Sequence, residues 1–187
     1  YDLLKLFVGA HGSLGVIIEA SFKLLPCPDM EIILASRCAG WAEFRARLDD
    51  VLRSALTPVV LDLHNLSGDR AQADLVIALA GSAEDVNWQR DLAATLGFAV
   101  APEGLAYDRQ FWIQESGPPV HRLSVLPSRL AATLASLGDV SFVARAGCGT
   151  VYYRGGPAPG RPDLPQPLLQ RVKDAYDPHH ILPAPPW

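Results

Sequence analysis

Three glycines stand close together near the start of the chain, in the stretch VGAHGSLGVIIEASFKLLP (residues 8–26). Glycine allows the backbone to approach a bound group closely and to adopt positive φ angles, so that successive N–H groups can point at an anion. The same spacing is also typical of a tight turn that precedes a strand. No Gly-Lys-Ser/Thr follows, so the stretch does not match the phosphate-binding P-loop. The residues alone leave a binding loop and a simple turn as alternatives.

Other reactive side chains are too scattered along the chain to form a recognisable motif. The chain has no G-x-S-x-G nucleophile elbow. His179 and His180 are adjacent on a predicted turn, where neighbouring side chains diverge, and no carboxylate or cysteine cluster completes a metal coordination sphere. Cys27, Cys38 and Cys148 are odd in number and lack a C-x-x-C spacing, which argues against a disulfide framework. We therefore expect no metal site, and reduced thiols in a cytoplasmic protein.

Composition narrows the class of protein. The chain has 187 residues, is 49% hydrophobic and has a mean hydropathy of +0.14, which is ample for a buried core. Its net charge is -4, with 16 Lys+Arg against 20 Asp+Glu and no basic stripe, so nucleic acid is not an expected partner. No apolar run reaches the roughly 18 residues of a membrane span, and no signal-peptide pattern is visible. The chain opens at Tyr1 and passes at once into LLKLFV, which we interpret as part of a longer protein.

The first half of the chain alternates strand-like and helix-like patterns. Apolar residues at period two predict strands, and an apolar stripe at helical spacing predicts helices. The predicted strands are residues 15–25, 30–38, 58–65 and 73–81, and the predicted helices are residues 41–56 and 82–97, the latter capped by Ser82. This order predicts an α+β fold of the split β-α-β, ferredoxin-like kind, an antiparallel sheet with helices packed on one face.

The second half of the chain predicts a similar but shorter series of strands and helices. A helix at 104–115, a strand at 120–127 and a helix at 128–138 are predicted, with Ser128 as cap and Gly138 as stop. Residues 140–154 then predict a hairpin, whose turn contains two glycines. The Pro- and Gly-rich residues 155–167 are expected to form a loop, and a last helix is expected to end at Asp177-Pro178.

Two widely separated stretches resemble one family. LFVGAHGSLGVIIEASFKLLP (residues 6–26) resembles the segment G-S-E-G-T-L-G-V-I-T-E-A of FAD-linked oxidases of the vanillyl-alcohol-oxidase type. LQRVKDAYDPHHILPAPPW (residues 169–187) resembles their C-terminal helix and turn, F-D-P-x-G-I-L-N-P-G. The short region between them, with PVHRLSV and AGCGTVYYR, looks most like the FAD-binding subunit of glycolate oxidase.

This resemblance implies a domain organisation and a cofactor, FAD. Residues 1–26 correspond to the end of the FAD-binding domain, and residues 27–187 to an α+β cap domain whose C-terminal helix and turn return to the FAD domain. His11 stands where the family usually has Glu, and Pro183-Ala184-Pro185 replaces the Asn-Pro-Gly turn. The residues that the resemblance assigns to main-chain contacts with FAD, or to packing against it, are Gly12, Leu14, Gly15, Val16 and Ile17.

The resemblance also implies an activity, the oxidation of a 2-hydroxy acid such as glycolate by hydride transfer to FAD. Arginine suits the substrate carboxylate because its fork binds both oxygens. The substrate candidates are His121, Arg122, Arg145 and Arg154, each weighed against an ordinary solvated role. On a strand His121 and Arg122 point to opposite faces, so at most one of them can face the flavin. His64, at a strand end, is expected to be structural or solvated.

A second hypothesis stays open at this point. The upstream half of the family's FAD domain, with its main pyrophosphate-binding loop, is not among the 187 residues, so we expect this chain alone not to hold FAD stably. The chain would then act as a non-catalytic partner module that docks onto other subunits of a glycolate-oxidase-like complex. Such a complex is expected to be cytoplasmic and associated with the membrane through partner subunits.

Overall fold

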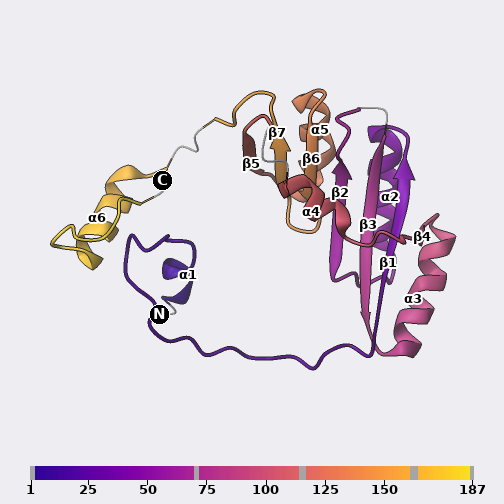
Figure 1. The fold of residues 1–187 in the computed structure, drawn as a ribbon, viewed down its shortest axis with the longest axis horizontal. Helices are drawn as coiled ribbons and strands as arrows, with labels where there is room; N and C mark the ends of the chain where they lie inside the picture. The colour runs from indigo at the N-terminus through magenta and orange to yellow at the C-terminus, as the bar shows by residue number, and fades with distance from the viewer. Residues whose placement is uncertain (1–2, 70–71, 114–116, 161–163, 186–187) are drawn as a thin grey trace. The chain divides into compact units, whose positions relative to one another are not determined.

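The computed structural model describes residues 3–69, 72–113, 117–160 and 164–185 (Figure 1). The chain divides into two compact units, which we describe separately. Unit 1 is Tyr1–Leu25 together with Gly160–Trp187, and unit 2 is Pro26–Pro159. No helix formed by the described residues is long and apolar enough to cross a membrane.

The described residues of unit 2 form a seven-stranded antiparallel sheet in the order β4-β1-β3-β2-β6-β7-β5. Figure 1 shows these strands side by side, from β5 at one edge to β4 at the other. The strands are β1 (Met30–Cys38), β2 (Val60–Asn65), β3 (Ala73–Gly81), β4 (Ala99–Val100), β5 (Val120–Ser124), β6 (Ser141–Arg145) and β7 (Thr150–Arg154). The helices of unit 2 are α2 (Trp41–Arg53), α3 (Ala83–Thr95), α4 (Ala106–Ile113) and α5 (Leu130–Leu137), with a short 3₁₀ helix η1 (Pro127–Arg129).

The sheet consists of two related halves. Elements β1, α2, β2, β3, α3 and β4 form a split β-α-β motif with the strand order β4-β1-β3-β2. Elements β5, α5, β6 and β7 repeat this arrangement without a fourth strand. The halves join edge to edge through β2 and β6, where Asp62 lies opposite Arg145 and Leu63 opposite Ala144. The predicted ferredoxin-like α+β class, and its shorter second copy, are therefore confirmed.

The main core lies between the sheet and helices α2, α3 and α5. Because side chains alternate along a strand, Leu75, Ile77 and Leu79 of β3 all point to this face, and each is fully buried. Helix α2 contributes Phe44 and Leu48 to the same core, as its apolar stripe predicts. Burial of each such large apolar side chain contributes about 1.5–3 kcal/mol to folding.

Helix α4 packs on the opposite face of the sheet, which we call the α4 face. Its Tyr107 and Phe111 are buried against Val76 of β3 and Val143 of β6. Residues 104–115 predicted this helix, but the expectation that the helices pack on one face holds for α2, α3 and α5 and not for α4, whose apolar residues cover Val76 and Val143 on the other face. The sheet is thus covered by three helices on one side and crossed by one short helix on the other.

Two local predictions are wrong. Residues 15–25 were expected to be a strand, but they form neither helix nor strand, and Ile18, Phe22 and Leu24 are 94%, 81% and 83% exposed. A strand needs a hydrogen-bonded neighbour, and the described residues supply none to this segment. Ser128 is not a helix cap, because it lies inside η1 after Pro127, and α5 begins only at Leu130. Its predicted stop is confirmed, since Gly138 ends α5 at a φ of 86°.

Unit 1 contains two helices among its described residues, α1 (Leu4–Phe7) and α6 (Gln166–Tyr176). The ring of Phe7 meets that of Tyr176 edge to face, with the centroids 5.2 Å apart. Helix α6 ends at Tyr176, directly before Asp177-Pro178 as expected, because the proline disfavours helical geometry in the residue before it. Most of unit 1 is therefore irregular backbone, which requires its own set of hydrogen bonds.

Candidate functional site

The glycine loop, residues 8–15, follows α1 and has an unusual backbone. Gly9 and Gly12 have φ angles of 86° and 77°, and His11 between them has a φ of 50°. A Cβ added to Gly9 or Gly12 would meet no atom within 4 Å, so the positive φ is what favours glycine there. The loop is closed by the carbonyl oxygen of Ala10, which accepts bonds from the Ser13 backbone N–H at 2.9 Å and from Ser13 Oγ at 2.6 Å.

Gly15 is needed for a different reason. A Cβ at this position would lie 2.9 Å from Cε1 of Phe7, so the aromatic ring packs directly against the backbone of Gly15. Leu14 beside it is 2% exposed. Val16 and Ile17, by contrast, are 75% and 62% exposed. Of the predicted cofactor-binding residues, Gly12, Leu14 and Gly15 thus share the folded loop, and Val16 and Ile17 lie on the extended segment after it.

The loop offers unpaired hydrogen-bond donors. Within the described residues, the backbone N–H groups of Gly12, Leu14 and Gly15 have no acceptor. Leu14 and Gly15 are consecutive, and consecutive N–H groups without an acceptor can bind anionic or carbonyl oxygens. A flavin dinucleotide carries such acceptors on its diphosphate and on its ring edges, so the loop fits the cofactor that the sequence predicts.

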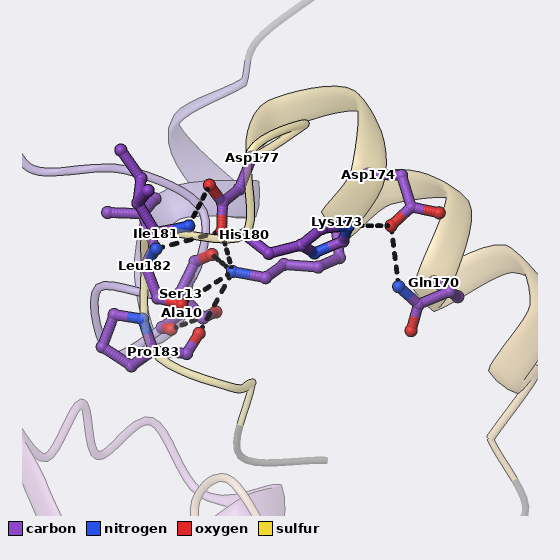
Figure 2. A network of polar contacts seen from close by, with 10 residues as sticks. All are labelled: Ala10, Ser13, Gln170, Lys173, Asp174, Asp177, His180, Ile181, Leu182 and Pro183. Atoms are coloured by element: carbon purple, nitrogen blue, oxygen red, sulfur yellow. Dashed lines mark hydrogen bonds and ion pairs between the residues drawn. The ribbon is translucent and has the colours of Figure 1, made fainter.

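A buried lysine, Lys173, connects the glycine loop to the C-terminal turn, and it forms an ion pair with Asp177 (Figure 2). Lys173 of α6 is 5% exposed, and its Nζ lies 2.6 Å from Oδ2 of Asp177. The same Nζ donates to the carbonyl oxygens of Ser13, Pro183 and Leu182, at 2.7, 3.1 and 3.3 Å. We call this group of five residues the Lys173 clamp.

Asp177 supplies the negative charge of the Lys173 clamp and also binds the turn that follows α6. Its carboxylate accepts the backbone N–H groups of Ile181 at 3.0 Å and Leu182 at 3.1 Å. The hydrogen bond from Lys173, together with these two backbone bonds, holds the pKa of Asp177 below its usual range despite burial. The turn after α6 is therefore shaped by a carboxylate that stays ionised.

Unit 2 carries a second polar network, on the α4 face. Asp62 of β2 is 2% exposed; it accepts a hydrogen bond of 2.7 Å from the hydroxyl of Tyr107 and forms an ion pair with Arg145. The other arm of Arg145 lies 2.6 Å from Oδ1 of Asp108. Burial and the bond to Asp62 both raise the pKa of Tyr107. Burial lowers the pKa of Arg145, but the two carboxylates raise it by more, so the guanidinium stays charged.

His64 lies next to this network and was not predicted as a site residue. Its ring stacks on that of Tyr107, with centroids 4.1 Å apart and planes at 14°. Its Nδ1 is buried and has no hydrogen-bond partner among the described residues. Burial is the main cause of the lowered pKa of His64, so the imidazole is neutral at neutral pH. The contact between residues 64 and 107 joins strand β2 to helix α4, and no local pattern signals it.

Two hollows open on the α4 face. A pocket of about 650 Å³ is bordered by residues that include Arg37, His64, Asp74, Glu103 and Tyr107. A smaller one of about 370 Å³ is bordered by residues 59–62, Arg145, Gly147 and Cys148. The structure thus places Arg145 at the rim of a hollow, where its guanidinium already contacts two carboxylates.

Two further substrate candidates lie on β5. His121 pairs with Tyr153, with ring centroids 5.3 Å apart, and faces the main core. Arg122 pairs with Tyr152 and lies on the α4 face, where it is exposed and forms no ion pair with a described residue. The two side chains are on opposite faces, as strand geometry predicts. Arg154, the remaining candidate, is 8% exposed and has a structural role instead, because both arms of its guanidinium donate to backbone carbonyl oxygens, those of Phe111 and Pro118.

Sequence comparison finds partial relatives. No family model matches the chain. It is 32% identical over 62 residues to glycolate oxidase subunit GlcD of Bacillus subtilis (strain 168), a match that covers 33% of the chain and 13% of that protein. It is 31% identical over 78 residues to GlcD of Escherichia coli (strain K12), covering 42% of the chain and 16% of the relative. These matches span only a small part of the relatives' length.

Structural comparison covers far more of the chain. Alkyldihydroxyacetonephosphate synthase in the P1 crystal form matches 95% of this chain and 46% of its own, with a TM-score of 0.61 and 16% identity. The P212121 form matches 91% and 47%, with a TM-score of 0.60 and 13% identity. The chain therefore spans about half the length of these structures. It is related in sequence, over part of its length, to glycolate oxidase subunit GlcD, and it shares the fold of alkyldihydroxyacetonephosphate synthase.

Proposed function

We propose that this chain is part of a flavin-dependent oxidoreductase that oxidises a 2-hydroxy acid such as glycolate. In this proposal residues 1–26 belong to the FAD-binding domain and residues 27–187 to the cap domain. The observation that carries it is the glycine loop, whose free N–H groups suit a dinucleotide, in a chain with sequence similarity to GlcD. FAD, when bound, would accept the hydride from the hydroxyl-bearing carbon.

The chain's own residues would bind and orient. The N–H groups of Gly12, Leu14 and Gly15 would donate to oxygens of the cofactor, and the buried Leu14 side chain would hold the loop in place. Arg122 is the best-suited carboxylate clamp among the predicted candidates, because its guanidinium forms no ion pair with a described residue. Arg145 would have to leave Asp62 or Asp108 to bind a substrate. The α4 face, which carries both arginines and the neutral His64, is the proposed substrate side of the cap.

The first test is the visible absorption spectrum of the full-length natural polypeptide that contains these residues, beside that of residues 1–187 alone. We expect flavin bands in the longer protein and none in the shorter one. Glycolate and other 2-hydroxy acids should then bleach the bound flavin under anaerobic conditions. The substitution Arg122→Gln should raise the substrate concentration needed for half-maximal bleaching. Bleaching that is unchanged by R122Q would reject that role for Arg122, and absence of flavin from the longer protein would reject the proposed cofactor.

A second candidate function is supported by the extended segment 16–25. Its apolar side chains include Ile17, Ile18, Phe22, Leu24 and Leu25, all more than 60% exposed. Such a surface favours contact with another polypeptide, as a partner module in a glycolate-oxidase-like complex would require, with any membrane association supplied by partners. Replacing Ile18 and Phe22 by Ser should then abolish co-purification with partner subunits while flavin content stays unchanged. Loss of flavin with retained partners would instead assign the segment to the FAD domain.

A further inference from the structure

The Lys173 clamp reaches the glycine loop through a single atom, the carbonyl oxygen of Ser13, at 2.7 Å from Nζ (Figure 2). A peptide unit is planar, and among the described residues every peptide bond is trans. The carbonyl of Ser13 and the N–H of Leu14 belong to one peptide unit and therefore point in opposite directions. By holding the carbonyl, Lys173 also directs the Leu14 N–H away from the clamp.

The orientation of this one peptide decides what the loop presents. The Leu14 N–H has no acceptor among the described residues, and Leu14 is 2% exposed, so this N–H is a buried donor without a partner. The preceding peptide is held separately, since both the N–H and the hydroxyl of Ser13 donate to Ala10. If the Ser13–Leu14 peptide turned over, Lys173 would lose an acceptor and a carbonyl oxygen would replace the free donor. A ligand oxygen would then meet an acceptor instead of a donor.

Lys173 does not act as a ligand itself. Its ammonium group has three protons and four acceptors around it, and Asp177, 3% exposed, balances its charge. The only part of the clamp that belongs to the glycine loop is the Ser13 carbonyl. Any effect of Lys173 on the glycine loop must pass through that peptide.

We propose that Lys173 is a positioning residue for the cofactor, which holds the Leu14 N–H ready to donate to an acceptor atom of a flavin dinucleotide. This rests on the proposed function and deepens it by assigning the loop's orientation to a residue 160 positions away. The C-terminal helix then takes part in cofactor binding without contact to the cofactor.

The test must separate positioning from simple stabilisation. In the full-length protein, Lys173→Met alone leaves Asp177 as an unpaired buried charge, so both stability and flavin binding should fall. In the double variant K173M/D177N no buried charge remains, and the amide oxygen introduced at position 177 can still accept one of the two N–H groups of the turn, which bind different oxygens of Asp177 in the wild type. We expect the Tm of the double variant to lie above that of K173M and below that of the wild type, with an affinity for FAD that remains at least roughly tenfold weaker than in the wild type.

A second readout follows the loop directly. Amide exchange measured by NMR should show the Leu14 N–H protected on addition of FAD in the wild type and unprotected in the double variant. The matched control is Gln170→Met, which removes an exposed hydrogen bond of 2.7 Å to Asp174 on the same helix and should change neither readout. A double variant that binds FAD as tightly as wild type, with Leu14 protected, would overturn the positioning role. A wild-type protein that binds no flavin would overturn the proposed function itself, together with any cofactor role for Lys173.

Discussion

Units 1 and 2 of this chain are held together in different ways. Unit 2 has a continuous apolar core, built from strands and helices whose backbone groups pair with one another. Unit 1 has two helices among its described residues, and its irregular backbone is fixed by one lysine and one aspartate, both almost completely buried. Apolar burial is distributed over many residues, whereas a buried ion pair concentrates its effect on two.

This difference matters for function. A packed core loses stability when a buried side chain is truncated, because each buried apolar group contributes to that stability. A loop that must present N–H groups has to leave them unpaired, so other atoms of the same loop have to hold it in shape. In unit 1 these are the carbonyl oxygens of Ala10 and Ser13. We therefore expect substitutions to affect stability most in unit 2 and binding most in unit 1.

The substitution Phe44→Ala in α2 should cause the largest difference in stability between the two units. Phe44 is fully buried in the core of unit 2, and truncation of a buried aromatic side chain costs about 3–5 kcal/mol. Urea unfolding followed by amide exchange should show unit 2 destabilised by that amount, with exchange in residues 8–15 changed far less. Equal loss of amide protection in both units would show that they unfold together, and would contradict the expected difference in stability between unit 1 and unit 2.

A smaller loss is expected from Asp62→Ala, which tests the polar network within unit 2. It removes the acceptor of Tyr107 and one partner of Arg145, whose other partner Asp108 remains, so we expect a cost of about 1–3 kcal/mol in urea unfolding. Asp108→Asn is the control, because that carboxylate is 36% exposed and should contribute less than about 1 kcal/mol. If Asp108→Asn lowered the free energy of unfolding more than Asp62→Ala does, the ion pair of Arg145 with Asp108 would be the more stabilising of the two.

The same contrast explains what could be predicted from sequence. Strands β1 and β3 begin and end where the apolar pattern predicts, at residues 30–38 and 73–81, because both pair along their whole length inside the sheet. Residues 15–25 alternate in the same manner but have no neighbouring strand among the described residues. An alternating pattern reports which face of a strand would be buried, and it carries no information on whether a partner strand is present.

The candidate site was predictable only in part, for a related reason. The glycine spacing indicated a special backbone, and Gly9 and Gly12 do have positive φ angles. The bond from Lys173 to Ser13 spans 160 residues, and that from Arg145 to Asp62 spans 83. Neither lysine nor arginine stands in a pattern that distinguishes it from a solvated residue. Such pairs follow from the tertiary fold and not from any local spacing.

A third prediction separates two uses of glycine in unit 1. Gly12→Ala places a side chain at a φ of 77° in open space and should cost about 1–2 kcal/mol of backbone strain. Gly15→Ala should shift the ring of Phe7, which a Cβ would approach to 2.9 Å, and so loosen the contact of Phe7 with Tyr176. Limited proteolysis of residues 8–15 measures both. Adding Phe7→Leu should restore the resistance of the Gly15→Ala variant to proteolysis and should not restore that of the Gly12→Ala variant. If it restored both, packing and not the positive φ would favour glycine at position 12.

The smallest expected effect is a difference in the response of the two units to acid. Burial lowers the pKa of His64 in folded unit 2, so the unfolded chain binds the proton first as the pH falls, and the stability of unit 2 should decline from about pH 6.5. The lowered pKa of Asp177 stabilises unit 1 above the carboxyl pKa of an unfolded chain, and this contribution should be lost only below about pH 4. Amide exchange at pH 7, 5.5 and 3.5 should therefore show unit 2 weakening first. His64→Gln should remove the decline between pH 6.5 and 5.5 and leave the response of unit 1 unchanged. A decline that persists in this variant would have to arise from another group, and His64 would then have no part in the acid sensitivity of the sheet.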